Sequence, residues 1–125
     1  MSTTCTNTIS PDGKYVIQKI VGEISAKLAL DFNRETHAIG RRLGISRYLV
    51  DATECRNMDS PMDDYNFAYS DMPDDPGIDR NAVVAMLVDP KDHSHDFLET
   101  VCKNAGLNVT IFRDRDAAVR HLVGE

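Results

Sequence analysis

The chain has few cysteines, and their spacing excludes two common kinds of stabilising site. Cys5, Cys55 and Cys102 lie far apart, and no C-x-x-C pair occurs among the 125 residues. Neither a disulfide framework nor a zinc site is therefore indicated. The longest apolar run, at 82–88, is too short to span a bilayer, and residues 1–8 lack the charged and apolar regions of a signal peptide. These absences predict a cytoplasmic protein with no integral membrane segment.

Basic residues are in the minority. The chain has 14 Lys and Arg against 20 Asp and Glu, and its net charge is −6. Such a chain repels phosphate backbones, so nucleic acid is excluded as an expected partner. Residues 59–79 hold seven Asp and no Lys or Arg, a pattern that would attract a basic partner or repel anionic lipid. A solvated loop is the simpler interpretation of this stretch.

Catalytic and cofactor-binding patterns are also missing. No Ser, His and Asp set and no Gly-rich phosphate loop is apparent. Residues 89–96 gather two His and three Asp, but His93 and His95 are two positions apart and point in different directions on a helix. We interpret this segment as the solvated start of a helix, with acids near its positive end. We therefore predict no metal site, no cofactor and no enzymatic activity.

The residues that are present predict one α/β domain over residues 1–125. Apolar residues make up 42% of the chain, enough for one core. The turn Ser10 to Gly13 predicts an N-terminal hairpin, and the apolar run 82–88 predicts a central parallel strand covered on both faces. Strands are expected at 15–24, 48–50, 82–88 and 109–112, and helices begin after Ser25, Ser60, Asp89 and Asp114, with a loop at 71–80. This order favours a mostly parallel mixed sheet with about four helices.

The second helix carries most of the candidate site residues. Ser60 followed by Pro61 and then Asp63 is typical of a helix start, and an exposed hydroxyl there could also accept a phosphoryl group or help to hold an anion. A soft and aromatic stripe follows on the same helix, predicted to lie between the helix and the sheet: Met62, Tyr65, Tyr69 and Met72. Core packing is the default interpretation of this stripe, and lining for an apolar ligand is the alternative.

Asp51 is a further candidate, because it follows the short apolar run 48–50. A phosphoacceptor of the response-regulator type would need an acidic pair after the first strand and a Lys after the last. The chain has Gly22 to Ile24 and Arg113-Asp114 at those places, so that assignment is rejected. We expect Asp51 to be a strand-end carboxylate that accepts loop N–H bonds.

Met58-Asp59-Ser60 resembles the Asp-Ser pair that starts the second helix in the anti-sigma-factor antagonist (STAS, SpoIIAA-like) family. The segments 82–88, 111–112 and 114–122 are similar to the SpoIIAA-like branch related to STAS and SEC14 proteins, so the resemblance covers nearly the whole chain. It implies a SpoIIAA/STAS-like fold and a domain that binds partners or apolar ligands near its mobile helices. The antagonists continue with Ser or Thr and then Gly after a phosphorylated Ser. Pro61 and Met62 stand there instead, so only Asp59 and Ser60 are carried over.

Together these observations predict a non-catalytic interaction or regulatory module with a protein partner. The leading alternative is a carrier or sensor of a small apolar or lipid-like ligand bound near the second helix, and an uncharacterised enzyme ranks third. A homodimer and peripheral membrane contact stay open.

Overall fold

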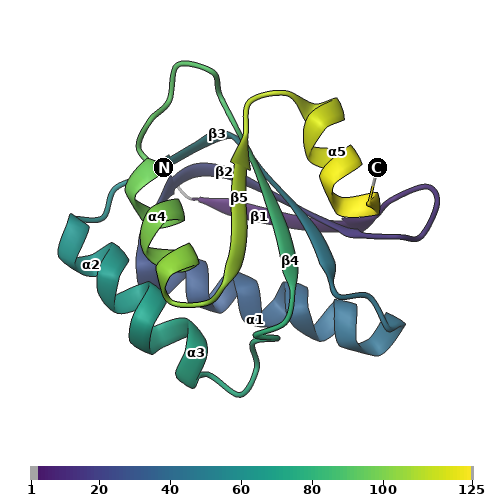
Figure 1. Cartoon of the computed structure of the whole chain (residues 1–125), viewed down its shortest axis with the longest axis horizontal. Helices are drawn as coiled ribbons and strands as arrows, with labels where there is room; N and C mark the ends of the chain where they lie inside the picture. Colours follow the sequence, from purple (N-terminus) through teal and green to yellow (C-terminus); the bar gives the residue numbers. More distant parts are fainter. Residues whose placement is uncertain (1–2, 125) are drawn as a thin grey trace.

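The computed structural model describes residues 3–124, and a five-stranded sheet organises them (Figure 1). The strands follow chain order across the sheet: β1 (Thr4–Ile9), β2 (Val16–Ile24), β3 (Arg47–Asn57), β4 (Val83–Val88) and β5 (Asn108–Phe112). β1 pairs antiparallel with β2, and every later pair is parallel. The predicted N-terminal hairpin and mostly parallel mixed sheet are therefore confirmed.

Four helical segments connect or follow the parallel strands. The first is α1 (Ala26–Leu43). The second is one continuous segment made of α2 (Pro61–Asn66), η1 (Phe67–Asp71) and α3 (Met72–Asp74). The third and fourth are α4 (Asp96–Asn104) and α5 (Arg115–Val123). The short η1 is a π-helix. In Figure 1, α5 stands apart from the group formed by α1, α2, α3 and α4.

The predicted helix ends of α1 and α5 are confirmed by their caps. Ser25 Oγ accepts the N–H of Leu28, and Gly44 ends α1 with φ of +70°, which favours glycine. At α5, a carboxylate oxygen of Asp114 accepts the N–H of Ala117 at 3.3 Å. These signals were readable in the sequence because each cap involves residues a few positions apart.

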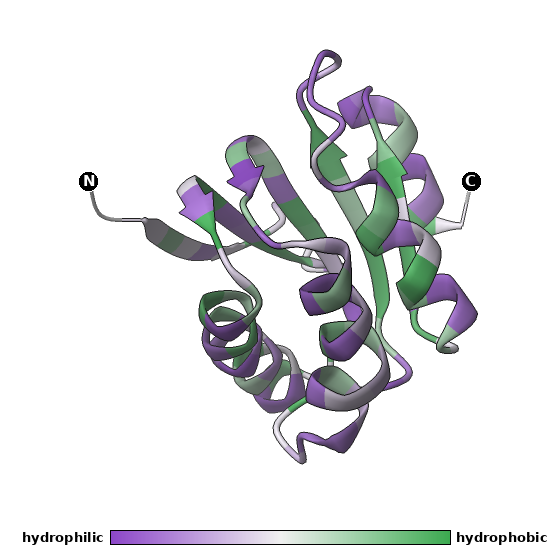
Figure 2. Cartoon of the chain, turned by 90° about the vertical axis from the view of Figure 1, so that its left-hand side faces the viewer, coloured by the Kyte–Doolittle hydropathy of each residue, from purple (hydrophilic) through white to green (hydrophobic). Residues whose placement is uncertain are grey.

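The two faces of the sheet carry different layers. Leu49 and Leu87 pack on one face against Ala118 and Leu122 of α5. On the other face, strand residues of β3 and β4 pack against α1, with Val50, Ala52 and Val88 contacting Leu28, Ala29 and Phe32. Figure 2 shows hydrophobic colour concentrated on β4, while the helices alternate between hydrophilic and hydrophobic residues. β4 lies between β3 and β5 and is parallel to both, as predicted, although β3 is the middle strand.

β3 is much longer than the predicted strand at 48–50. It continues to Asn57 because residues 54–57 keep pairing with β2. Lys19 pairs with Asp51 and Val21 with Glu54, so β3 has one extra residue there, a β-bulge. The prediction that Asp51 ends the strand is therefore wrong.

Two helix boundaries also differ from the prediction. α4 begins at Asp96, not after Asp89, because Asp89 accepts the N–H of Lys91 and Asp92 accepts that of Ser94, and such side-chain turns compete with helix. Residues 71–74, expected as loop, are helical. They continue the segment that begins at α2 and bury Met72.

Candidate functional site

The carboxyl ends of β2 and β3 lie at one edge of the sheet, where α1 and α2 begin. Ser60 is the N-cap of α2, as predicted. Its Oγ accepts the N–H of Asp63 at 3.2 Å, and the Asp63 carboxylate accepts the N–H of Ser60 at 3.4 Å, which completes a capping box. Ser60 is exposed. Its hydroxyl therefore stabilises the helix start at a place that a partner can reach.

Two carboxyl groups close to Ser60 in the chain, those of Asp59 and Asp64, are partly or fully buried. Asp64 is 4% exposed, and Asn57 Nδ2 donates to its Oδ1 at 3.0 Å. Burial raises the pKa of Asp64, against the opposing effects of the Asn57 hydrogen bond and the nearby His95. Burial also raises the pKa of the half-buried Asp59, and the charge of Asp64 adds to this. The edge therefore carries a small acidic centre that desolvation makes costly to ionise.

Asp51 lies away from this centre. Its Oδ1 accepts the N–H and the hydroxyl of Thr53, and its Oδ2 lies 3.5 Å from Nη1 of Arg115. Because residues alternate along a strand, Asp51 shares the α5 face of β3 with Leu49. The structure thus separates Asp51 from Asp59 and Ser60, and gives it a partner on α5.

The predicted apolar stripe is split between the outside and the inside of the molecule. Met62, Tyr65 and Tyr69 are 66%, 48% and 41% exposed, whereas Met72 is 8% exposed. The rings of Tyr65 and Tyr69 stack with centroids 4.6 Å apart. The prediction that all four lie between helix and sheet is wrong for the first three, because the segment instead buries Asp64, Phe67 and Ala68.

A cavity of about 100 Å³ lies between the sheet and the layer of α1, α2, η1 and α4. Of the predicted site residues, Asp59 and Met72 line it. The sequence interpretation missed the other polar residues at its α2 end, Asn57, Asp64 and His95. A buried Asp near a helix start leaves no distinctive sequence pattern, because its burial depends on strands and helices far along the chain.

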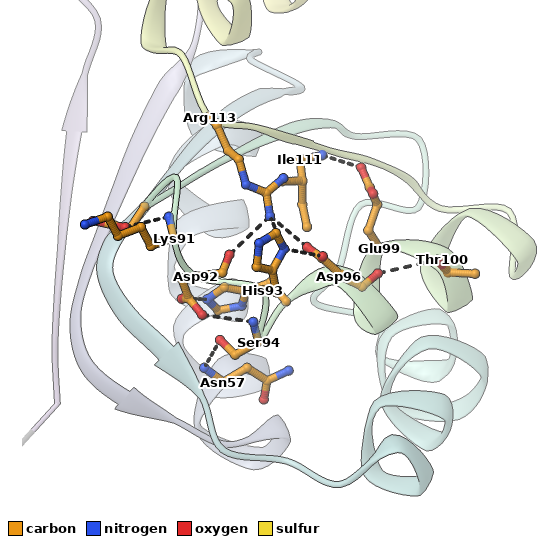
Figure 3. A network of polar contacts seen from close by, with 12 residues as sticks. Asn57, Lys91, Asp92, His93, Ser94, Asp96, Glu99, Thr100, Ile111 and Arg113 are labelled. Carbon is orange, nitrogen blue, oxygen red and sulfur yellow. Dashed lines mark hydrogen bonds and ion pairs between the residues drawn. The ribbon is translucent and has the colours of Figure 1, made fainter.

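The segment 89–96 forms a network of polar contacts with Arg113. His93 Nδ1 lies 2.8 Å from Asp96 Oδ2, and Arg113 donates to Asp96 and to the carbonyl of Asp92 (Figure 3). His95 is buried instead of solvated, which corrects the prediction, and its Nε2 lies 3.0 Å from the carbonyl oxygen of Cys55. Within residues 3–124, no group of three or more His, Cys, Asp or Glu is placed to hold a metal ion.

Within residues 3–124, none of His37, His93, His95 and His121 makes a hydrogen bond to a Ser, Thr or Cys side chain. No described helix combines the length and the apolar character that crossing a membrane requires. What these residues present is a small α/β domain with an accessible helix start and a cavity between the sheet and its helices.

Comparison with solved structures identifies the fold as SpoIIAA/STAS-like. An anti-sigma factor antagonist from Mycobacterium paratuberculosis superposes with a TM-score of 0.62 at 7% identity, over 98% of this chain and 95% of that one. An uncharacterized protein from Shewanella loihica with a SpoIIAA-like fold gives a TM-score of 0.50 at 17% identity, over 97% and 93% of the two chains. No protein-family model and no curated protein matches the sequence. The predicted fold is thus confirmed.

Proposed function

We propose that this chain is a non-catalytic regulatory module that binds a protein partner through the surface of α2. We define the α2 surface as Met58, Met62, Tyr65 and Tyr69. All four side chains are at least 41% exposed, and together they form the observation that carries the proposal. Exposed Met and Tyr side chains are typical of interaction sites, because Tyr buries a large area at little cost in conformational entropy and Met adapts its shape to a partner.

The charge around the α2 surface indicates the chemistry of the partner. Residues 59–79 contain seven Asp and no Lys or Arg, and of these Asp75 is paired with Arg34. A partner segment with exposed basic and apolar residues would complement this surface. Ser60 lies at its edge, so a phosphoryl group there would add negative charge and weaken such a contact.

The likeness to an anti-sigma factor antagonist supports a regulatory role with a protein partner. At 7% identity this likeness shows only the fold, so the partner is inferred from the α2 surface alone. The proposed location is the cytoplasm, where the three free thiols stay reduced.

Partner capture with surface variants tests the proposal. The double variant Tyr65→Ser and Tyr69→Ser should lose the protein that immobilised wild type retains, because two exposed anchor side chains are gone. Leu43→Ser is the matched control, since Leu43 is also an exposed apolar residue but lies at the end of α1. Both variants should keep the wild-type melting temperature within a few degrees. Equal capture by all three proteins would overturn the proposal.

A further inference from the structure

The cavity exists because small side chains occupy positions where larger ones would fill the core. Ala26 and Ala29 of α1 face Ala52 and Cys55 of β3, and Cys102 of α4 also lines the space. Protein interiors are otherwise close-packed, and an unfilled core costs stability. The empty volume is therefore a property of the sequence at these positions.

The size of the cavity restricts what it can hold. Its volume is about 100 Å³, whereas an engineered apolar cavity of about 150 Å³ in another protein binds benzene or xenon. The space is smaller than one that takes benzene, so it suits one short alkyl chain. A long lipid tail, which the sequence left open, does not fit without movement of the helices.

The α2 end of the cavity is acidic. Asp59 and Asp64 both line this end, and Asp64 is only 4% exposed. The cation among the lining residues is Arg80, which comes just before β4 and so lies at the opposite end of the parallel strands. Among the described residues, one side chain, Asn57, donates to the Asp64 carboxylate, which has acceptor sites for about four hydrogen bonds. His95 also lines this end, and its Nε2 lies against the Cys55 carbonyl. A ligand carboxylate would meet two carboxyl groups here, so an apolar acid is disfavoured.

A second feature of the backbone coincides with the cavity. Phe67 and Met72 line it, and they bracket the π-helical turn η1. π-helical turns in α-helices occur frequently at functional sites, where they re-aim side chains. Here the turn begins three residues after Asp64, and its first residue, Phe67, lines the cavity.

We propose that this cavity binds a small primary amine whose apolar body is a short alkyl chain. The ammonium group donates to the Asp64 carboxylate and the body lies among the small side chains of α1 and β3. The site is independent of the α2 surface proposed for the partner, because Met62, Tyr65 and Tyr69 do not line the cavity.

Calorimetry on the full chain with three matched probes tests the chemistry of the ligand. Propylamine should bind more tightly than 1-propanol, and propanoate should not bind at millimolar concentration. Asp64→Asn should weaken propylamine binding by about 10- to 100-fold, the size expected for a lost charge-assisted hydrogen bond, and should leave 1-propanol binding nearly unchanged. Equal binding of propylamine and propanoate, or no binding of any probe, would overturn the proposal.

A cavity-filling variant tests the location. Ala29→Leu should abolish propylamine binding, whereas Ala38→Leu, on the exposed side of the same helix, should bind like wild type. If Ala29→Leu binds propylamine with wild-type affinity, the amine lies elsewhere and the proposal is wrong. If Ala29→Leu fails to fold, the Asp64→Asn result decides, because that change removes a charge without adding volume.

Discussion

The two faces of the sheet differ in how completely they are packed. On the α5 face, Leu49, Ala85 and Leu87 meet Ala118 and Leu122, and each of these side chains is at most 5% exposed. None of the five lines the cavity, which lies wholly on the other face. On the first face α5 packs tightly on β3, β4 and β5, while α1, the α2 segment and α4 leave space above the second. The cavity proposed above as a binding site is therefore a feature of the second face.

Buried polar groups follow the same division. Gln18 and Thr36 are hydrogen-bonded to each other at 2.8 Å on the cavity face, and His37, Asp64 and His95 also line the cavity. On the α5 face, Asp51 is a buried carboxylate, and it is held by Thr53 and Arg115. Buried polar groups are expensive unless they are bonded, so their concentration on one face points to a specific arrangement there.

The largest expected effect compares large-to-small changes on the two faces. Leu122→Ala should lower the free energy of unfolding by about 2–5 kcal/mol, since Leu122 is fully buried in the α5 cluster. Leu98→Ala, at a half-buried position that already borders the cavity, should cost less. Urea denaturation of both variants measures the difference. An equal loss would show that the cavity face is packed as tightly as the α5 face.

Acid should destabilise the cavity face through His37. Burial lowers the pKa of His37 to about 4, with Asp79 raising it and Arg41 lowering it. Its Nδ1 accepts the N–H of Asp79 at 2.9 Å, and its ring stacks on Tyr48. The unfolded chain binds this proton near pH 6.5, so the contribution of neutral His37 is complete above pH 6.5 and is lost as the pH falls toward 4.

The effect of His37 can be measured as the change in the free energy of unfolding between two pH values. Between pH 6.5 and pH 5 the loss is about 2 kcal/mol, from about 1.4 kcal/mol per pH unit. His37→Gln, which keeps a hydrogen-bond acceptor, should flatten this part of the stability profile. The raised pKa values of Asp59 and Asp64 act in the opposite direction and are shared by both proteins. Parallel profiles for variant and wild type would contradict the assignment.

Local chemistry was predictable from the sequence, and long-range burial was not. The caps at Ser25, Ser60 and Asp114 were predicted because an N-cap bonds to an N–H three residues away. The burial of His95 was missed because its partner, the Cys55 carbonyl, is 40 positions away. Asp51 was misplaced because the bulge in β3 depends on pairing with β2.

The sequence analysis also predicted the wrong buried face for the segment that runs from α2 to α3. A stripe at 62, 65, 69 and 72 fits helical spacing, but so does the set 64, 67, 68 and 72, and the second set is the buried one. Its first member is an Asp, whose burial depends on Asn57. Periodicity alone therefore could not choose between an outward and an inward face, and the prediction placed Tyr65 and Tyr69 between helix and sheet although they lie on the surface.

The smallest expected effect compares the helix caps that serve the two faces. Ser60→Ala on α2 and Asp114→Ala on α5 should each lower the free energy of unfolding by about 1 kcal/mol, because each leaves an N–H of the first turn without its acceptor. Ser60→Asp keeps an acceptor and should be nearly as stable as wild type. Thermal or urea denaturation measures all three changes.

Partner capture then separates a cap from a switch at Ser60. If Ser60 is a regulatory phosphoacceptor at the edge of the α2 surface, Ser60→Asp should lose the partner that wild type retains, although its stability is unchanged, and Ser60→Ala should keep it. Asp114→Ala should keep the partner as well, since α5 covers the opposite face of the sheet. Equal capture by wild type and both Ser60 variants would leave Ser60 with its capping role alone. The regulation of the module would then have to act through Met58, Met62, Tyr65 and Tyr69 without a charge switch, because the rest of the α2 start is already acidic.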